Sequence, residues 1–172
     1  VDTIMVGRLG SVSIGAVGVG SAVYYVPSLF GIGLLLGLDT FVSQAYGRKD
    51  YDECHRWLAQ GVYIALAYAP VSMLIVWGLT FSLGRFGINA AVASSAQQYL
   101  AWINLGTLPL LVYAAFRRHL QGIGRVKPIM FALLSANLVN WAGNWIFIYG
   151  HWGAPALGVR GSALSTMAAR IY

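Results

Sequence analysis

Residues 13–38 read SIGAVGVGSAVYYVPSLFGIGLLLGL and carry no charged side chain. The nearest charges on either side are Arg8 and Asp39. A helix needs about 20 residues to cross a bilayer core of about 30 Å, so this stretch is long enough to span a membrane. Because its apolar residues follow one another without regular alternation, the pattern favours a helix over a strand of a membrane barrel.

Three more uncharged stretches have the same character. Of the 172 residues, 58% are apolar and 9% are charged, which is unlike the composition of a soluble domain. The chain is therefore predicted to be an all-α integral membrane protein. We predict four complete membrane-spanning helices, over residues 13–38, 57–83, 96–116 and 128–149.

Both ends of the chain are expected to be parts of further helices. Residues 1–6 have the character of a last helical turn or two, and residues 162–172 that of the opening of another helix. We therefore predict that residues 1–172 are one incomplete membrane domain of a longer protein.

The positive charges predict how the helices are oriented. The net charge is +6, and seven Lys or Arg residues lie in the loops at 47–56 and 117–127, against three in the other connections. The positive-inside rule places these two loops in the cytoplasm. The basic excess then requires no nucleic-acid partner. The single cysteine, Cys54, excludes an internal disulfide.

Three prolines, Pro27, Pro70 and Pro109, lie inside predicted spans. Proline removes a backbone hydrogen bond, so each is expected to kink its helix. Pro27 is a candidate gate or packing residue on this ground.

The run NLVNWAGNWIFIYG, residues 137–150, places three asparagines in an apolar helix. Asn137, Asn140 and Asn144 are spaced i, i+3, i+7 and therefore share one helix face. Their amides can join neighbouring helices, at about 0.6 kcal/mol each, or form the wall of a water-accessible cavity. We expect Asn140 and Asn144 to line a cavity. Asn137, which lies deeper, is a candidate gate or packing residue, and interhelical packing is the favoured role.

Three polar side chains are predicted to lie at one depth in the membrane. Asp2, Asn144 and Thr166 each lie six residues from a predicted membrane boundary, which is about 9 Å along a helix. Asp2 is the strongest functional candidate, because an ionisable group inside a membrane is costly and can take up and release a proton. The alternative is a structural hydrogen bond to a neighbouring helix.

Other polar residues give weaker signals. Asp39 lies nine residues before Arg48, toward the cytoplasm, and is a candidate gate or packing residue. His55, His119 and His151 are scattered and lack the spacing of metal ligands, so no metal site is predicted. No phosphate-binding loop or nucleophile elbow is present, and the chain is predicted not to be an enzyme.

Five motifs resemble a known family in order and spacing. They are VDTIMVGRLG (1–10), LGLDTFVSQAYGRKDYDECHRWLAQG (36–61), FRRHLQGIGRVKPIM (116–130), NWAGNWIFIYG (140–150) and LGVRGSALST (157–166). Together they resemble the amino-terminal half of the multidrug and toxic compound extrusion (MATE) transporters. The resemblance implies a MATE-like six-helix lobe, from the end of helix 1 to the start of helix 6. A complete protein would have twelve helices in two lobes, with the carboxy-terminal lobe absent from this chain.

The resemblance also implies a function. Such a protein is a cation-coupled antiporter of the cell membrane, inner or plasma, and a monomer when full length. It exports amphipathic, often cationic, drugs or toxic metabolites through the lipid bilayer by alternating access, with H⁺ or Na⁺ as coupling ion and no cofactor. Asp2 matches the coupling residue of the family, and Asn140, Asn144 and Thr166 match its partners. Because Asn occupies the position of Asn144, where the family has Asp or Asn, Asp2 is the one carboxylate of this cluster.

Other functions remain open at this point. A flippase for lipid-linked saccharides has a related architecture, but it is expected to line its lobe with several Arg residues for a pyrophosphate. Arg170 is the one Arg within a predicted span. A membrane-embedded enzyme or a structural subunit is a further alternative. The lack of paired His, Cys or clustered carboxylates argues against the enzyme.

Overall fold

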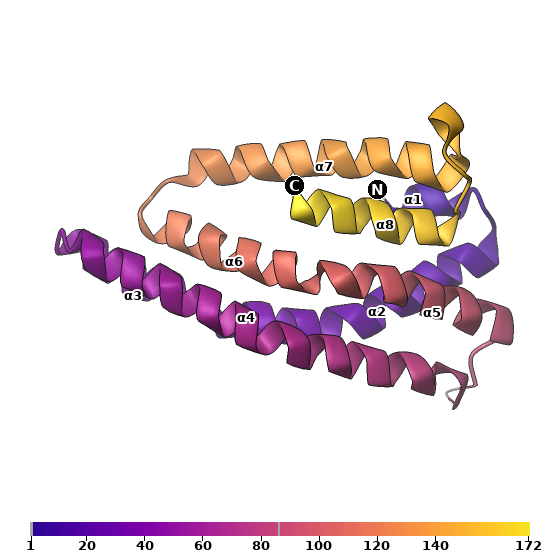
Figure 1. The fold of residues 1–172 in the computed structure, drawn as a ribbon, viewed down its shortest axis with the longest axis horizontal. Helices are drawn as coiled ribbons and strands as arrows, with labels where there is room; N and C mark the ends of the chain where they lie inside the picture. Colours follow the sequence, from indigo (N-terminus) through magenta and orange to yellow (C-terminus); the bar gives the residue numbers. More distant parts are fainter. Residues whose placement is uncertain (1, 86) are drawn as a thin grey trace.

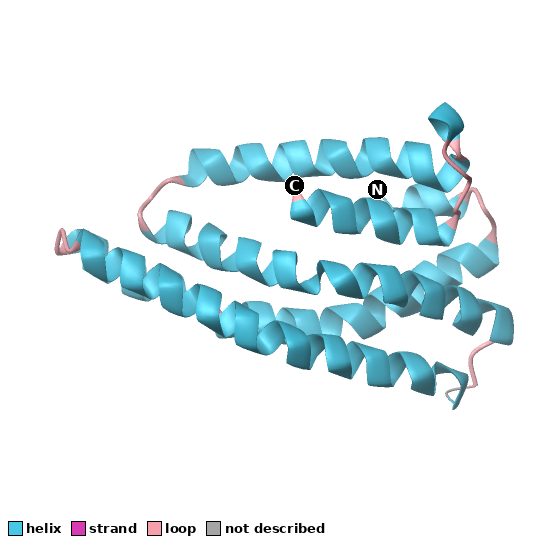
Figure 2. Ribbon diagram, in the orientation of Figure 1, coloured by secondary structure: helices cyan, strands magenta, loops and turns pink. Residues whose placement is uncertain are grey.

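The computed structural model describes residues 2–85 and 87–172, and these residues form helices and no strands (Figures 1 and 2). Val1 of the first motif lies outside the described residues. The α-helices are α1 (Asp2–Gly7), α2 (Ser11–Leu34), α3 (Leu38–Gly47), α4 (Tyr51–Ser82), α5 (Ala90–Ile103), α6 (Thr107–Gly122), α7 (Val126–Tyr149) and α8 (Val159–Ile171). The short 3₁₀ helices are η1 (Leu83–Arg85), η2 (Asn104–Gly106) and η3 (His151–Gly153).

The prediction of four membrane spans is confirmed. Four helical segments are long and apolar enough to cross a membrane. They are Ser11–Gly47, Tyr51–Arg85, Ala90–Gly122 and Val126–Tyr149. Together with the ends supplied by α1 and α8, they give an all-helical, multi-pass membrane domain.

The predicted boundaries at the basic end were wrong. The loops expected at 47–56 and 117–127 shrink to the turns 48–50 and 123–125, because α3, α4 and α6 continue past the apolar segments. Asp50 caps α4, since its carboxylate accepts a hydrogen bond from the backbone N–H of Glu53 at 2.9 Å. Charged residues thus stay helical where their side chains can reach water.

The expected kinks at Pro27 and Pro70 do not interrupt their helices, since α2 and α4 run continuously through these residues. The first span is interrupted instead after Leu34, between α2 and α3, and the third at η2, just before Pro109. The Pro27 carbonyl accepts a hydrogen bond from the Tyr68 hydroxyl at 3.0 Å. A neighbouring helix therefore satisfies backbone close to the proline, as is usual in membrane bundles.

The helices pack in two neighbouring groups. One group is α1, α7 and α8, and the other is α2 to α6. In Figure 1, α7 and α8 run side by side with α1 beside them, while α5 and α6 follow one line across the middle of the bundle. Gly161 allows α8 to approach α7 closely, because a Cβ atom at this position would overlap the Phe147 carbonyl oxygen. Helix α4 packs on α6, and α2 packs on α5.

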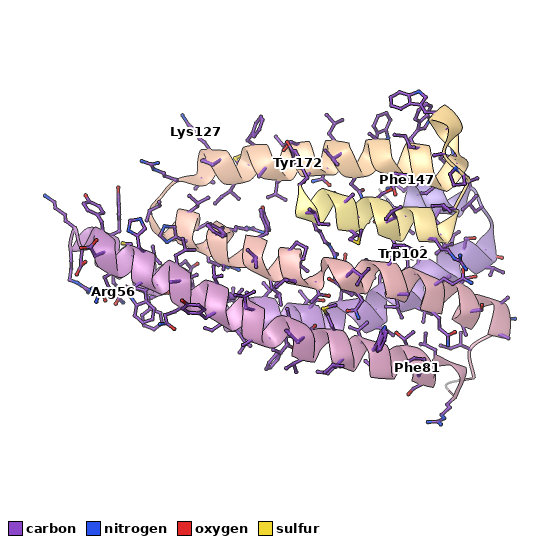
Figure 3. All side chains as sticks on the ribbon, in the orientation of Figure 1. Arg56, Phe81, Trp102, Lys127, Phe147 and Tyr172 are labelled. Carbon is purple, nitrogen blue, oxygen red and sulfur yellow. The ribbon has the colours of Figure 1, made fainter. Side chains whose placement is uncertain are left out.

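The two basic turns lie at the same end of the bundle. Figure 3 shows Arg56 and Lys127 at one end, with Phe81 and Phe147 toward the other. This arrangement agrees with helices that cross the membrane in alternate directions. The cytoplasmic location of the basic end stays a prediction from the positive-inside rule.

Candidate functional site

Three helices bring their polar side chains to one point, as the depth argument predicted. Asp2 stands at the start of α1, Asn144 on α7 and Thr166 on α8. The Asn144 side-chain nitrogen donates to Asp2 Oδ1 at 2.6 Å. The Thr166 hydroxyl donates to the other carboxylate oxygen, Oδ2, at 2.9 Å. The Asp2 carboxylate is therefore bound by two side chains that each lie more than 140 positions from it in the sequence.

Asn140 closes these contacts into a ring. Its side-chain oxygen accepts a hydrogen bond from Asn144 at 3.3 Å, and its nitrogen donates to the Thr166 hydroxyl oxygen at 3.1 Å. Each member of the ring, Asp2–Asn144–Asn140–Thr166, thus contacts the next. All four predicted site residues come together, and their role in ion coupling stays a prediction.

Asp2 has neutral partners in this ring. Both carboxylate oxygens lie within hydrogen-bond distance of a neutral donor, so this geometry can satisfy an ionised carboxylate. Within residues 2–85 and 87–172, the two ion pairs are Arg48–Glu53 and Arg118–Asp39, so no basic side chain is paired with Asp2. A negative charge held this way in a membrane favours a proton or a cation.

Asn144 adds an oxygen that has no partner. Its side chain is fully buried, and Oδ1 has no hydrogen bond to any described residue, although Nδ2 donates twice. A buried polar atom without a partner calls for an explanation. Carboxylate, amide and hydroxyl oxygens together are suited to a hard cation, and they can also hold a water molecule.

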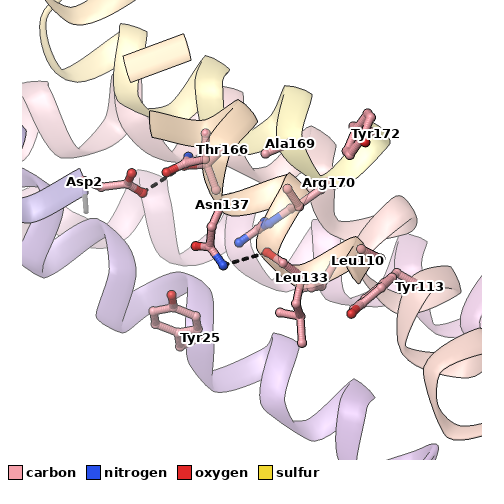
Figure 4. Close-up of a pocket in the computed structure, with 13 residues that line it drawn as sticks. Asp2, Tyr25, Leu110, Tyr113, Leu133, Asn137, Thr166, Ala169, Arg170 and Tyr172 are labelled. Atoms are coloured by element: carbon pink, nitrogen blue, oxygen red, sulfur yellow. Dashed lines mark hydrogen bonds between the residues drawn. The ribbon is translucent and has the colours of Figure 1, made fainter. Parts of the chain in front are cut away.

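The ring opens onto a cavity of about 480 Å³, a size typical of small-molecule sites (Figure 4). Side chains from α1, α2, α6, α7 and α8 form its wall. The lining residues are Asp2, Tyr25, Leu110, Tyr113, Ala132, Leu133, Ala136, Asn137, Asn140, Thr166, Ala169, Arg170 and Tyr172. Asn144 lies buried behind this wall.

Asn137 lies at the cavity, and in the described residues its side chain makes no hydrogen bond to another helix. Its amide nitrogen donates to the Leu133 carbonyl of its own helix at 2.8 Å, and the residue is exposed and lines the cavity. At this depth the cavity separates α7 from Leu110 and Tyr113 of α6. The amide therefore meets open space where a neighbouring helix was expected.

Asp39 lies apart from this cavity. It stands in the first turn of α3, where Oδ1 accepts a hydrogen bond from the backbone N–H of Thr40 at 3.0 Å. Oδ2 forms an ion pair with Arg118 of α6 at 3.4 Å. The contact joins α3 to α6, which fits the packing role among the two that were expected. Pro27, buried in α2, also contributes no side chain to the cavity wall.

The structure shows two groupings that the sequence analysis missed. His55 and His119, expected to be unrelated, lie stacked with ring centroids 6.4 Å apart. In the described part of the chain no group of three or more His, Cys, Asp or Glu residues could hold a metal ion. Arg170 was weighed against a flippase only, yet it lines the same cavity as Asp2. An arginine in an apolar helix was the signal available for it.

Comparison with known proteins identifies a family and several relatives of this chain. Residues 1–146 match the MatE family model. The probable multidrug resistance protein NorM of Mesorhizobium japonicum is 29% identical over 167 residues, covering 96% of this chain and 36% of that protein. NorM of Geobacillus kaustophilus is 33% identical over 174 residues, covering 100% and 38%. The chain thus spans little more than a third of the length of these relatives.

Solved structures share the fold. A MOP superfamily transporter from Pyrococcus furiosus superposes with a TM-score of 0.83 at 20% identity, over 99% of this chain and 37% of that chain. A multidrug resistance MATE family transporter in an outward-facing conformation gives 0.82 at 21% identity, with the same coverage. The chain therefore shares the helix arrangement of these structures over almost its whole length.

Proposed function

Since the chain belongs to the MatE family, we propose that it forms the amino-terminal part of a cation-coupled antiporter. The complete protein exports amphipathic, often cationic, drugs or toxic metabolites across the cell membrane in exchange for H⁺ or Na⁺. It works as a monomer and performs no catalysis. The observation that carries the proposal is the carboxylate of Asp2, held by neutral donors at the edge of a drug-sized cavity.

The ring supports a simple exchange. With Asp2 ionised, Asn144 and Thr166 donate to its two oxygens, and its negative charge attracts a cation into the cavity. Protonation of Asp2 removes that charge and turns one acceptor oxygen into a donor. The substrate cation and the coupling ion then compete for one group, so that binding of one favours release of the other.

Thr166 can adjust to either state of Asp2. Its hydroxyl lies 2.9 Å from Asp2 Oδ2 and 3.0 Å from the Ser162 carbonyl oxygen. When Asp2 is ionised the hydroxyl donates to the carboxylate. When Asp2 is protonated the hydroxyl donates to Ser162 and accepts from Asp2, so the ring keeps its contacts in both states.

A sodium ion is the alternative coupling ion for the same ring. The unpartnered side-chain oxygen of buried Asn144, next to the Asp2 carboxylate, supports this variant. Antiport by H⁺ and antiport by Na⁺ therefore predict the same residues, and an ion-gradient experiment distinguishes them.

The flippase alternative is not supported. Among the described residues that line the cavity, Arg170 is the one basic side chain, whereas a pyrophosphate carrier is expected to need several.

The test uses the full-length protein that contains this segment. Asp2→Asn is expected to abolish efflux of a cationic dye from cells while the amount of protein in the membrane persists, because the neutral amide cannot attract a cation. The matched control is Asp52→Asn, the same substitution at an exposed acid near the start of α4. Near-normal efflux by the Asp2→Asn protein would overturn the proposal.

A further inference from the structure

Arg170 places a positive charge in the cavity that holds Asp2. It stands in the last turn of α8, one turn beyond Thr166. Its side chain lines the cavity together with Asn137 and Tyr25 (Figure 4). A positive charge in the cavity repels a bound cation, and an arginine inside a membrane helix is costly. Arg170 is therefore not explained by cation binding alone.

The guanidinium is held in place by a buried tyrosine. Arg170 Nη1 donates to the Tyr24 hydroxyl oxygen at 2.6 Å, and its Cζ lies 4.8 Å from the centroid of the Tyr24 ring. Tyr24 is fully buried. A Cβ atom at Gly106 would lie 3.2 Å from Arg170 Cδ, so the absence of a side chain in η2 makes room for the stem of the arginine. These contacts fix the direction of the charge.

Tyr24 is itself supported by a chain of buried polar groups. The Thr107 hydroxyl lies 3.4 Å from the Tyr24 hydroxyl and 3.2 Å from the Asn104 side-chain oxygen. Asn104 donates to the Met73 carbonyl at 3.0 Å. These hydrogen bonds connect α8 to α2, α6, η2 and α4, so the guanidinium is positioned by four other elements.

The charge of Arg170 is not neutralised by the described residues. The ion pairs within them are Arg48–Glu53 and Arg118–Asp39. A guanidinium carries five N–H donors, and Tyr24 receives the one hydrogen bond that the Arg170 side chain makes to the described residues. Tyr113, which also lines the cavity, has a buried hydroxyl without a hydrogen-bond partner. The guanidinium therefore has N–H donors without an acceptor among the described residues, at the wall of the cavity.

We propose that Arg170 is an anion-binding subsite of the cavity, which recognises a carboxylate on the transported molecule. Arginine binds carboxylates through two parallel hydrogen bonds, and the fixed guanidinium is ready for this geometry. The cavity then carries opposite charges at Asp2 and Arg170 and accepts amphipathic zwitterions as well as cations. The inference rests on the proposed export function and adds a substrate class to it.

The test compares two dyes that differ in one group. A rhodamine with a free carboxylic acid is a zwitterion, and its methyl ester is a cation of nearly the same size. Proteoliposomes of the full-length protein are expected to transport both. Arg170→Gln should lower the transport efficiency of the free acid about tenfold, the value of one charge-assisted hydrogen-bonded pair, and change that of the ester less than about twofold.

Matched variants separate the charge from the fold. Arg160→Gln changes an exposed arginine in the first turn of the same helix and should leave the ratio of the two dyes unchanged. Arg170→Lys should keep part of the preference. If Arg170→Gln fails to accumulate in the membrane, Tyr24→Phe replaces it, because loss of the hydroxyl frees the guanidinium and should lower the acid-to-ester ratio about threefold.

The outcomes separate this inference from the function on which it rests. Transport of the ester but not the acid by the wild type would overturn the anion subsite and leave the antiporter standing. Equal loss of both dyes in Arg170→Gln, or an unchanged ratio in Arg170→Gln or in the substitute Tyr24→Phe, would also overturn the subsite. Such a result would mean that Arg170 serves the fold or a carboxylate elsewhere in the protein. A wild type that transports neither dye would overturn both proposals.

Discussion

Asp2 and Asp39 are both acids near the ends of apolar helices, but the partners of their carboxylates differ. Asp39 has its own arginine, Arg118, at 3.4 Å, together with a backbone N–H. Asp2 is held by two neutral side chains and borders the cavity. The charge of Asp39 is neutralised by Arg118 and joins two helices. The charge of Asp2 is bound by neutral donors only and remains available to an ion. Substitutions at the two sites and in the cavity test this distinction.

Among four further substitutions, the largest effect is expected from Asn144→Leu, which keeps the approximate volume and removes the buried amide. Asp2 and Asn140 each lose a hydrogen bond, and the unpartnered oxygen disappears. Two lost bonds to or near a charge correspond to about 3 kcal/mol, so dye efflux per molecule should fall about a hundredfold. Quantified efflux normalised to membrane protein checks this. A fall in protein amount with unchanged efflux per molecule would show that Asn144 is interhelical packing.

A smaller loss is expected from Thr166→Val. Valine has nearly the same shape and lacks the hydroxyl that links Asp2 to Asn140. Efflux should fall about tenfold, as for one charge-assisted hydrogen bond. Thr166→Ser, which keeps the hydroxyl, is the control and should retain most activity. Equal activity of the valine and serine variants would remove Thr166 from the exchange mechanism.

Asp39→Asn is expected to lower the stability of the fold slightly and to leave ion coupling unchanged. The partly exposed ion pair with Arg118 contributes about 1 kcal/mol at most, so thermal stability of the purified protein should fall slightly. Transport per molecule should stay near the wild-type value. If efflux is lost while stability is retained, Asp39 is the gate that was the other reading of this residue, and the contrast with Asp2 fails.

The smallest effect is expected from Asn137→Ala. The Asn137 amide is bonded within its own helix and exposed to the cavity, so its loss should leave the amount of folded protein unchanged. The apparent KM for a substrate should shift by no more than about threefold, because one cavity contact is removed. A marked drop in folded protein would restore the packing role first expected for this residue.

The sequence predicts the depth of side chains better than their direction. Counting six residues from a boundary placed Asp2, Asn144 and Thr166 at one level, since helical rise is constant. The same count could not say that Asn137 faces a cavity, because that depends on how far α6 stands from α7. Tyr24, the partner of Arg170, is 146 positions away in the sequence and was out of reach of any local pattern.

The sequence contains a signal for the start of α4 that the predicted boundaries did not use. The segment Asp50–Glu53 reads DYDE, which has a capping residue followed three positions later by glutamate, a signal of a helix start. Reading it would have moved the beginning of α4 to Tyr51. The interruption after Leu34 has no comparable signal, because Pro27 lies earlier in a helix that continues through it.

The most direct test of the account is the ion dependence of cation binding. Binding of tetraphenylphosphonium to the purified full-length protein is measured at several pH values, with and without Na⁺. In the wild type and in Asp39→Asn, lower pH or added Na⁺ should weaken binding, because the coupling ion competes for the Asp2 carboxylate. In Asp2→Asn, binding should be weak and independent of the coupling ion. An Asp2→Asn protein that binds the cation with the wild-type dependence on pH and Na⁺ would contradict the account.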